Sequence, residues 1–209
     1  MNKIKVYIVG FDHDIDRMYR QRGYEIVDSI HKADIVQFIG GADVNPELYG
    51  ERLITGTHCD FHADKRDKTA WDASADKMKV GICRGGQFVN VMNGGRMWQH
   101  VEGHNRGVHA ISDLLFSTDR DNLDEISVTS THHQMMIPSA KGELLAFGNN
   151  IAYGHKSNGG STPTKVDAEV VWYSDTKSLC FQPHPEYRGH PECTDYFFKL
   201  IDFFYEEKE

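Results

Sequence analysis

The sequence predicts an α/β fold with a mainly parallel open sheet and helices on both of its faces. Three apolar stretches, each running into glycine, point to this fold: Ile4–Gly10, Asp34–Gly41 and Met78–Gly86. Strands that are buried on both faces are apolar throughout, and the helical or polar segments between these stretches leave room for parallel crossovers. We therefore expect consecutive strands to lie side by side with their carboxyl ends at one edge.

The first elements form a βαβ opening. Lys3–Val9 predicts a strand, Asp14–Arg22 a helix that ends at Gly23, and Tyr24–Val27 a short strand. Asp34–Ile39 follows as a buried strand. The next segment, Ala42–Lys77, is long and polar, with only Lys68–Asp76 weakly helical, so we expect mostly functional loop there.

The rest of the chain continues the alternation with less regularity. We expect the following elements: strand Met78–Ile82, helix Gln87–Met92, strand Glu125–Thr131, a strand pair at Val170–Tyr173 and Leu179–Gln182, and an amphipathic helix at Cys193–Tyr205. Arg96–Val128 is ambiguous apart from its last residues. Asn149–Thr164, rich in Gly, Ser, Asn and Thr, predicts a mobile loop.

Length and composition limit the function classes. A chain of 209 residues predicts one domain, 1–209. The net charge of −8 and the lack of a basic cluster argue against nucleic acid as partner. No apolar run is long enough to cross a bilayer, so we expect no membrane association and a cytoplasmic location. Four scattered cysteines predict reduced thiols.

Cys83 has the surroundings of a nucleophile. It follows the apolar strand in MKVGICRGGQFV and is flanked by Gly81, Gly85 and Gly86. A nucleophile on a tight strand-to-helix turn needs small neighbours, and the helix after it directs its positive end at the sulfur, which lowers the pKa of the thiol. A buried structural cysteine is the alternative, but it does not require three glycines. We therefore predict that Cys83 is a catalytic thiolate.

The base and its orienting carboxylate are expected in FQPHPEY, residues 181–187. Pro183 and Pro185 keep this piece extended, so His184 and Glu186 project to the same side. Glu186 would fix the orientation of His184, and His184 would take the proton of Cys83. Taken alone, a histidine beside a glutamate is a common surface feature; together with the Cys83 turn it predicts a catalytic triad.

These motifs resemble the class I glutamine amidotransferases, and more narrowly the γ-glutamyl hydrolase branch that includes γ-glutamyl-γ-aminobutyrate hydrolases. The resemblance rests on GGADVNP at 40–46, GICRGGQ at 81–87, WQHV at 98–101, THHQ at 131–134 and HPE at 184–186. It implies a flavodoxin-like, glutamine amidotransferase-like fold and a cysteine hydrolase that cleaves a γ-glutamyl amide through a thioester. It implies no cofactor.

The resemblance also assigns further site residues. The backbone N–H groups of Gly41 and Arg84 would form the oxyanion hole. Gln87 and the segment His132, His133 and Gln134 would hold the glutamyl group, the latter largely through backbone, although His132 and His133 could instead be two polar turn residues. One departure from the branch lies in DKRDKTA at 64–70, which keeps an Arg-Asp pair but lacks an acidic residue three positions later. This difference bears on the leaving-group side of the site.

The remaining histidines suggest metal binding only weakly. His100, His104 and His109 have a spacing similar to that of a zinc-binding helix, but Glu102 is misplaced for HExxH and Gly103 weakens a helix. His58 and His62, with Cys59 and Asp60, form a second candidate cluster. We predict no metal at either place.

Three functions remain open on the sequence alone. The first is a free-standing hydrolase that acts on a γ-glutamyl amide or glutamine. The second is a glutaminase that delivers ammonia to a separate synthase or ligase partner. The third is a non-catalytic or redox-sensing relative, which would not need His184 and Glu186. The first is favoured because the GGADVNP and THHQ blocks match the hydrolase branch. The sequence leaves homo-oligomer formation open.

Overall fold

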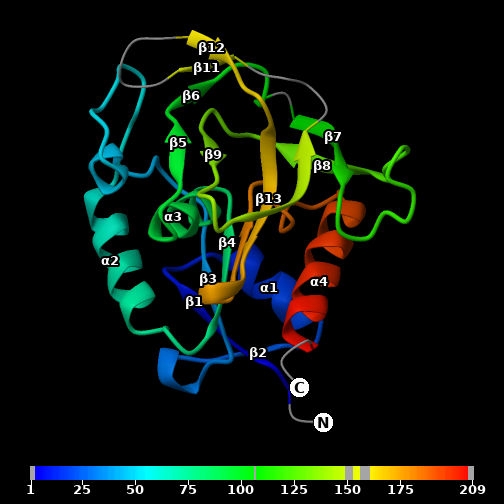
Figure 1. The fold of residues 1–209 in the computed structure, drawn as a ribbon. Coiled ribbons are helices and arrows are strands. Elements are labelled where there is room, and N and C mark those ends of the chain that lie inside the picture. Colours follow the sequence, from blue (N-terminus) through cyan, green and yellow to red (C-terminus); the bar gives the residue numbers. More distant parts are fainter. Residues whose placement is uncertain (1–2, 106, 149–152, 156–160, 207–209) are drawn as a thin grey trace.

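The structure is a computed structural model that describes residues 3–105, 107–148, 153–155 and 161–206. Its main sheet has the strand order β2-β1-β3-β4-β14-β13-β10-β7-β8, with β5 and β9 attached beside β13 (Figure 1). A small second sheet joins β12, β11 and β6. The fold therefore combines the expected α/β layers with an additional antiparallel region.

The parallel half of the sheet contains five strands. These are β1 (Lys5–Val9), β2 (Glu25–Ile26), β3 (Ile35–Phe38), β4 (Met78–Ile82) and β14 (Ser178–Phe181). Each neighbouring pair among them runs parallel, so that β3, β4 and β14 end at one edge. Every residue of β3, β4 and β14 is buried, in agreement with their apolar sequences.

The antiparallel half continues from β14. Its strands are β5 (Arg96–Trp98), β7 (Gly107–Asp113), β8 (Glu125–Ser130), β9 (Met135–Ile137), β10 (Glu143–Gly148) and β13 (Asp167–Tyr173). β14 and β13 pair antiparallel, as do β13 with β10, β10 with β7 and β7 with β8. The small sheet consists of β6 (His100–Val101), β11 (Tyr153–His155) and β12 (Ser161–Pro163).

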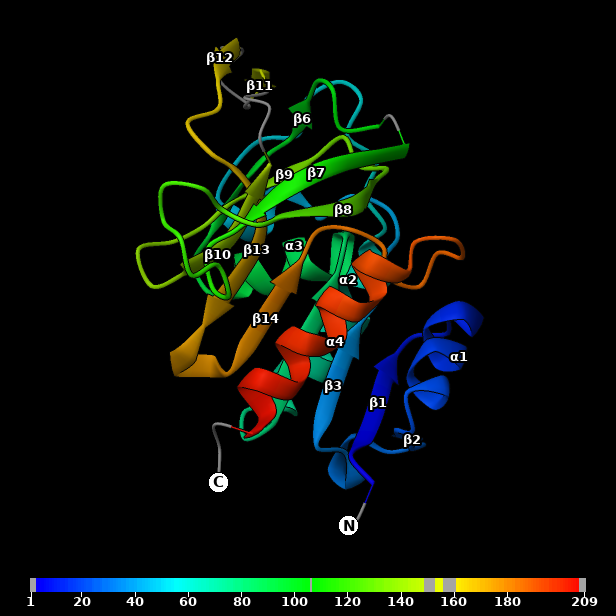
Figure 2. The same cartoon turned by 90° about the vertical axis from the view of Figure 1, so that its right-hand side faces the viewer.

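Helices cover both faces of the parallel half (Figure 2). α1 (His13–Gln21) and α4 (Pro191–Glu206) pack on one face, where Tyr19, Phe197 and Phe198 form edge-on aromatic contacts. α2 (Phe61–Asp72) and α3 (Arg84–Met92) lie on the other face, and Phe88 of α3 packs against Phe38 of β3. Short 3-10 helices lie at Ile30–Lys32, Pro46–Tyr49 and Ser174–Thr176.

The fold class predicted from the sequence is confirmed, and β4 has the predicted bounds. The sheet is more mixed than expected because its antiparallel half was only partly recognised. None of the described helices combines the length and apolar character that a membrane span requires.

Two local predictions need correction. Helix α2 begins at Phe61, seven residues before the expected start, with Asp60 accepting hydrogen bonds from the N–H groups of His62 and Ala63. Its buried face contains Asp64 and Asp67, so the sequence lacks a helical apolar stripe. The expected loop at 149–164 contains β11 and β12; residues 149–152 and 156–160 lie outside the described part.

Candidate functional site

Cys83 lies on the turn that joins β4 to α3. Its φ of 50° is unusual for a residue with a side chain, and this kind of backbone strain is typical of functional sites. The residue is 8% exposed, at the carboxyl ends of β3, β4 and β14. The strand-to-helix turn predicted from the sequence is therefore present, and it places the sulfur where open α/β sheets bind ligands.

The neighbouring glycines are required by close backbone approach. A side-chain carbon on Gly85 would overlap the carbonyl group of Phe38 in β3, and one on Gly81 would overlap the backbone of Gly85. At Gly86 it would lie 3.0 Å from the backbone nitrogen of Phe181 in β14. The start of α3 can therefore rest directly on three strands, which fixes the position of Cys83.

His184 and Glu186 lie on the segment between β14 and α4. Glu186 Oε1 is 2.6 Å from His184 Nδ1, and His184 N–H donates to Thr129 Oγ1 over 2.6 Å. A side-chain carbon on Gly40 would lie 3.0 Å from His184 Cε1 and 4.0 Å from Cys83 Cβ. The side chain of His184 is thus next to Cys83, although about a hundred residues separate them in sequence.

The surroundings of His184 raise its pKa well above the ordinary value of 6.5. Burial acts in the opposite direction, but the contacts with Cys83 and Glu186 outweigh it because both favour the protonated ring. The ring also stacks on Tyr187 at 4.5 Å between centroids. This arrangement favours an imidazolium beside the sulfur.

Gln182 is a neighbour of the sulfur that the sequence reasoning missed. Its Nε2 lies 3.6 Å from Cys83 Sγ, and its Oε1 accepts a hydrogen bond from Gln87 Nε2 over 3.1 Å. Gln182 stands two residues before His184 in the same motif. Period-2 alternation along this extended piece would have placed it on the His184 side.

The side chain of Arg84 has a structural role that was also missed. It is buried and ion-paired with Asp64 and Asp67 of α2, and Arg66 donates to the second oxygen of Asp67 over 2.9 Å. Burial lowers the pKa of Arg84 and raises that of Asp64, each opposed by the ion pair. The pair anchors α2 to the turn that carries Cys83, and the Arg-Asp pair noted in the sequence is part of it.

A cavity of about 200 Å³ opens over Cys83. Its lining includes all the residues that the resemblance assigned to oxyanion and substrate binding: Gly41, Arg84, Gln87, His132, His133 and Gln134. Arg84 is the first residue of α3, where N–H groups lack a partner within the helix. Gly41 has a φ of 155°. The described structure therefore brings together every residue that was predicted for the site.

The substrate-binding candidates differ in accessibility. Gln87, His132 and Gln134 are at most 5% exposed, and both Gln87 Nε2 and His132 Nδ1 contact the carbonyl oxygen of Gln134. His133 is more open, and its Nε2 lies 2.9 Å from Asp43 Oδ1 across the cavity. The hydrogen bond to Asp43 raises the pKa of His133, against the effect of burial.

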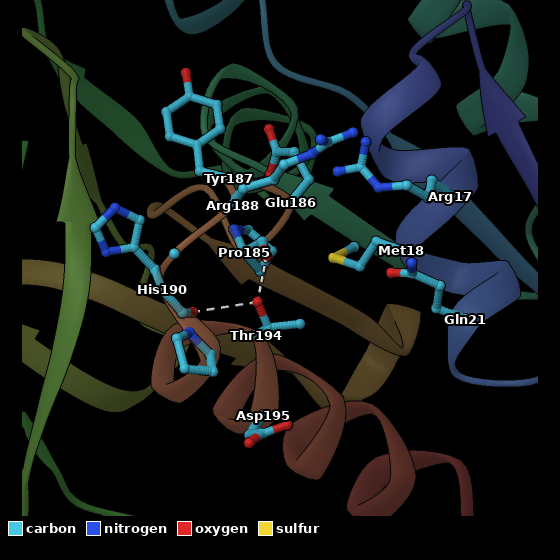
Figure 3. Close-up of a pocket in the computed structure, with 12 residues that line it drawn as sticks. Arg17, Met18, Gln21, Pro185, Glu186, Tyr187, Arg188, His190, Thr194 and Asp195 are labelled. Atoms are coloured by element: carbon cyan, nitrogen blue, oxygen red, sulfur yellow. Dashed lines mark hydrogen bonds between the residues drawn. The ribbon is translucent and has the colours of Figure 1, made fainter.

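A second and larger cavity, of about 530 Å³, lies on the other side of the His184 segment (Figure 3). α1 contributes Arg17, Met18 and Gln21, and the segment from Pro185 to Asp195 forms the opposite wall. Thr194 Oγ1 donates to the carbonyl oxygen of Pro185 over 2.5 Å and so ties the triad segment to α4. Because Cys83 does not line this cavity, it is not the candidate catalytic pocket, although Glu186 lies in its wall.

His100, His104 and His109 do not lie on one helix. His100 belongs to β6, His109 to β7, and His104 to the loop between them. His58 lines the Cys83 cavity and Cys59 pairs with Asp43 in an isolated bridge. Among the described residues, the group whose side chains could converge on a metal ion is His104, His132 and Glu169.

Comparison with known families agrees with this geometry. The family model of Peptidase C26 matches residues 19–146, more than half of the chain, including Cys83. The chain belongs to the Peptidase C26 family. The match ends before His184 and Glu186.

Related proteins place this Peptidase C26 member among glutamine amidotransferase-like chains. It is 24% identical over 196 residues to the carbamoyl phosphate synthase small chain of Pasteurella multocida, covering 93% of this chain and 45% of that protein. It is 40% identical over 72 residues to the glutamine amidotransferase-like protein YvdE of Lactococcus lactis, covering 32% and 30%. The chain spans less than half the length of these curated relatives.

A solved structure supports the same fold. A protein of Thermoplasma acidophilum described as a GMP synthase subunit has a TM-score of 0.69 at 18% identity, covering all of this chain and 97% of that one. The glutamine amidotransferase-like architecture is therefore shared.

Proposed function

We propose that this protein is a cysteine hydrolase that cleaves γ-glutamyl amide bonds through a γ-glutamyl thioester and releases glutamate with an amine or ammonia. The observation that carries the proposal is the contact of Cys83 with His184, whose ring is oriented by Glu186, together with the cavity of about 200 Å³ that Cys83 lines. An inert buried cysteine would need neither the strained turn nor the oriented histidine.

The chemistry follows from these positions. The Cys83 thiolate attacks the γ-carbonyl carbon, and the oxyanion that forms accepts hydrogen bonds from the backbone N–H groups of Gly41 and Arg84. Protonated His184 gives its proton to the leaving nitrogen, so the C–N bond breaks and the thioester remains. Neutral His184 then takes a proton from water, which attacks the thioester and restores the thiolate.

Substrate orientation is assigned to the opposite wall of the cavity. Gln87 and the His132–Gln134 segment would contact the glutamyl α-amino and α-carboxylate groups, in part through backbone atoms. The internal hydrogen bonds of Gln87 and His132 fix the carbonyl group of Gln134 and thereby the shape of this wall. His133 with Asp43 would then lie nearest to the entering substrate.

A second candidate function is that of a glutaminase component that delivers ammonia to a separate synthase or ligase. The names of the relatives favour it, since one is the small chain of carbamoyl phosphate synthase. The two functions share the triad and differ in whether a partner protein must bind before the site turns over. No nucleic acid, membrane or cofactor enters either proposal.

Steady-state release of glutamate from a panel of γ-glutamyl amines and glutamine tests the proposal. We expect turnover of at least one γ-glutamyl amine by the isolated chain and accumulation of a γ-glutamyl thioester under acid quench. Weak activity on glutamine alone would favour the ammonia-delivering function. Turnover that survives unchanged in Cys83→Ser would contradict both. Cys59→Ser, which alters a partly exposed thiol that does not line the cavity, is the matched control.

A further inference from the structure

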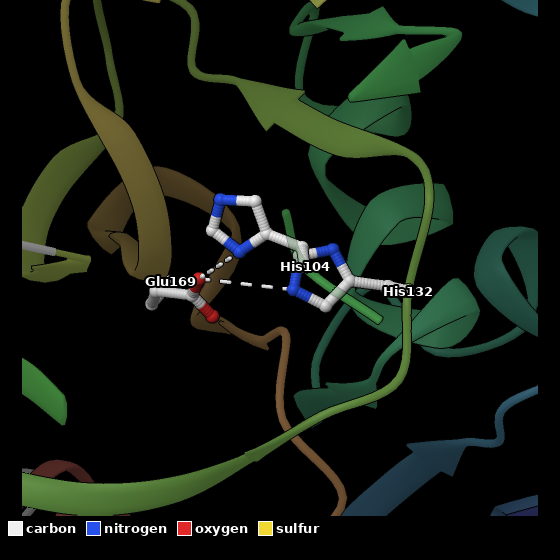
Figure 4. Close-up of side chains that lie close together, drawn as sticks. All are labelled: His104, His132 and Glu169. Atoms are coloured by element: carbon white, nitrogen blue, oxygen red, sulfur yellow. Dashed lines mark ion pairs between the residues drawn. The ribbon is translucent and has the colours of Figure 1, made fainter. Parts of the chain in front are cut away.

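A second cluster of polar side chains lies behind the His132–Gln134 wall. His104, His132 and Glu169 offer one ligand atom each, and these atoms all lie within 4.8 Å of one another (Figure 4). The residues come from three segments: the loop after β6, the loop between β8 and β9, and strand β13. All three are at most 5% exposed, so the cluster is an internal site, and it shares His132 with the lining of the Cys83 cavity.

Three imidazole nitrogens approach one oxygen of Glu169. Oε1 lies 3.3 Å from His109 Nε2, 3.5 Å from His104 Nδ1 and 3.7 Å from His132 Nε2. These distances are longer than the usual 2.7–3.2 Å of N–H···O hydrogen bonds. These nitrogen–oxygen distances bracket or slightly exceed the separation of about 3.3–3.4 Å between ligand atoms of a tetrahedral ion at about 2.0–2.1 Å, and the ligand atoms of His104, His132 and Glu169 lie within 4.8 Å of one another, so a bound ion would draw them closer together.

The other nitrogens of two of these rings are already engaged. His104 Nε2 lies 2.9 Å from Asp167 Oδ2, and His132 Nδ1 lies 2.8 Å from the carbonyl oxygen of Gln134. Both partners are acceptors, so each ring uses its N–H there and, when neutral, directs a lone pair toward Glu169. Such carboxylate and carbonyl partners are the usual outer contacts of metal-bound histidines.

The facing atoms lack other partners in the described part of the chain. His104 Nδ1, His109 Nε2, His132 Nε2 and both carboxylate oxygens of Glu169 are buried and make no hydrogen bond with a described residue. Lone pairs that face a buried carboxylate repel it unless a cation lies between them. Either additional protons or a metal ion would remove this repulsion.

Protons are the competing explanation. Burial lowers the pKa of His104, but its contacts with Asp167 and Glu169 outweigh that effect and raise the pKa overall. Protons on His104, His109 and His132 would, however, face the same carboxylate oxygen at 3.5, 3.3 and 3.7 Å, all longer than ordinary hydrogen bonds. A single divalent ion can satisfy all of the facing atoms together.

We propose that His104, His132 and Glu169, with His109 as the fourth ligand, bind a divalent transition-metal ion of the Zn²⁺ class. Three imidazoles and one carboxylate suit zinc and its first-row neighbours better than Mg²⁺ or Ca²⁺, which prefer oxygen ligands. Four protein ligands leave no open position, so the ion is structural rather than catalytic.

The site would stabilise the wall of the Cys83 cavity. His132 N–H donates to the carbonyl oxygen of His104 over 3.0 Å, and Gln182 N–H donates to that of Glu169 over 2.8 Å. The ion would therefore link the substrate-side segment to the strand that precedes His184. Loss of the ion is expected to weaken substrate binding more than it changes the reactivity of Cys83.

Metal analysis of the untagged full chain, expressed with added Zn²⁺ and dialysed, tests the proposal without measuring activity. We expect about one equivalent of metal per chain and, after exchange with Co²⁺, the visible absorption of a four-coordinate nitrogen and oxygen site. Glu169→Gln and His109→Gln should each lower the bound metal and the Co²⁺ absorption. His31→Ala, an exposed histidine far from the cluster in sequence, should retain both.

Three results would overturn the proposal. The first is a wild-type chain that binds neither Zn²⁺ nor Co²⁺ after loading. The second is equal metal content in folded Glu169→Gln, folded His109→Gln and His31→Ala, which would locate the ion elsewhere. The third is a strong thiolate charge-transfer band in the Co²⁺ protein, which would assign the ion to cysteine. Metal loading of the wild-type chain tests the proposal without any variant. A variant that fails to fold therefore does not prevent the test.

Discussion

The two halves of the sheet position their polar residues by different means. In the parallel half, Cys83 is held by backbone packing, because Gly81 and Gly85 leave no space for side chains between α3 and the strands. In the antiparallel half, His132 and Glu169 are held by backbone hydrogen bonds with His104 and Gln182, and their side chains approach each other at 3.7 Å. The glycines that allow the position of Cys83 lie within a dozen residues of it in sequence. The positions of His132 and Glu169 depend on segments that are far apart in the chain.

This difference predicts unequal responses to mutation. The Cys83 turn of the parallel half is held by close backbone packing, so that substitution of its side chain should remove chemistry while leaving neighbours in place. Residues held by long-range polar contacts should respond to charge and pH. His184 lies at the boundary, since it follows β14 of the parallel half but its backbone is held by Thr129 of β8.

The largest effect is expected for Cys83→Ser. The hydroxyl is a much weaker nucleophile than the thiolate, so kcat should fall on the order of 10⁴-fold or more. The backbone turn is fixed by the glycines, so the melting temperature should change little. Glutamate release and thermal unfolding measured on the same preparation check both statements. A large loss of stability would show that the sulfur, rather than backbone packing, holds the turn.

Glu186→Gln is expected to be the next largest. The amide cannot stabilise the imidazolium, so kcat/KM should fall on the order of 10³-fold. Because Glu186 contributes to the raised pKa of His184, the ring should lose its proton at lower pH in the variant. The alkaline limb of the rate profile should therefore move to lower pH. Thr194→Val, which alters a neighbouring contact without changing charge, serves as control; an unmoved limb in Glu186→Gln would contradict the assignment.

Asp67→Ala should destabilise the fold without touching the triad. Asp67 and Arg84 are both nearly inaccessible, and removing Asp67 leaves the buried Arg84 guanidinium with Asp64 as its one remaining ion-pair partner, at a cost of about 3 kcal/mol. Asp72→Ala, which breaks an exposed pair with Lys68 on the same helix, should cost only about 0.5 kcal/mol or less. Urea unfolding of both variants measures the difference. Equal costs would mean that α2 is not anchored through Arg84.

The smallest effect is expected for Asp43→Asn. The folded pKa of His133 is raised, so its pairing with Asp43 stabilises the fold fully below about pH 6.5 and loses this effect as the pH rises through the folded value. The free energy of unfolding of the wild type should exceed that of Asp43→Asn at about pH 5.5. This advantage of the wild type should be smaller, by about 0.5 kcal/mol, at about pH 8.5.

Urea unfolding at both pH values measures this difference. Asp28→Asn, whose ion-pair partner Lys32 is a lysine rather than a histidine, is the control and should show no such trend. If wild type and Asp43→Asn differed in stability by the same amount at both pH values, the pairing of Asp43 with His133 would not contribute to stability.

Some elements could be predicted because their signals are local. The bounds of β4 follow from a mainly apolar run that contains one lysine, Lys79, and the turn at Cys83 follows from its glycines. Helix α2 was largely missed because its buried positions 64 and 67 are aspartates, which match no apolar stripe. Their partner Arg84 is some twenty residues further along the chain, and no local pattern links them.

The same reasoning applies to the histidines. From spacing alone, His104 and His109 were compared with a zinc-binding helix, and the absence of a helix pattern led to the expectation of no metal. The structure instead joins these two residues to His132 and to Glu169, which was not considered. The alternation of side chains along a strand could have shown that Glu169 lies on a buried strand. It could not have shown which loops cover that strand.

By itself, the sequence determined the α/β class, the strand-to-helix turn at Cys83 and the candidates His184 and Glu186. These depend on apolar periodicity, on glycine and proline geometry and on spacing within a few residues. Tertiary structure alone decided that His184 meets Cys83, that Arg84 is neutralised by α2 and that three histidines surround Glu169. Such contacts are set by the packing of distant segments, and a linear pattern carries no information about which distant segments will meet.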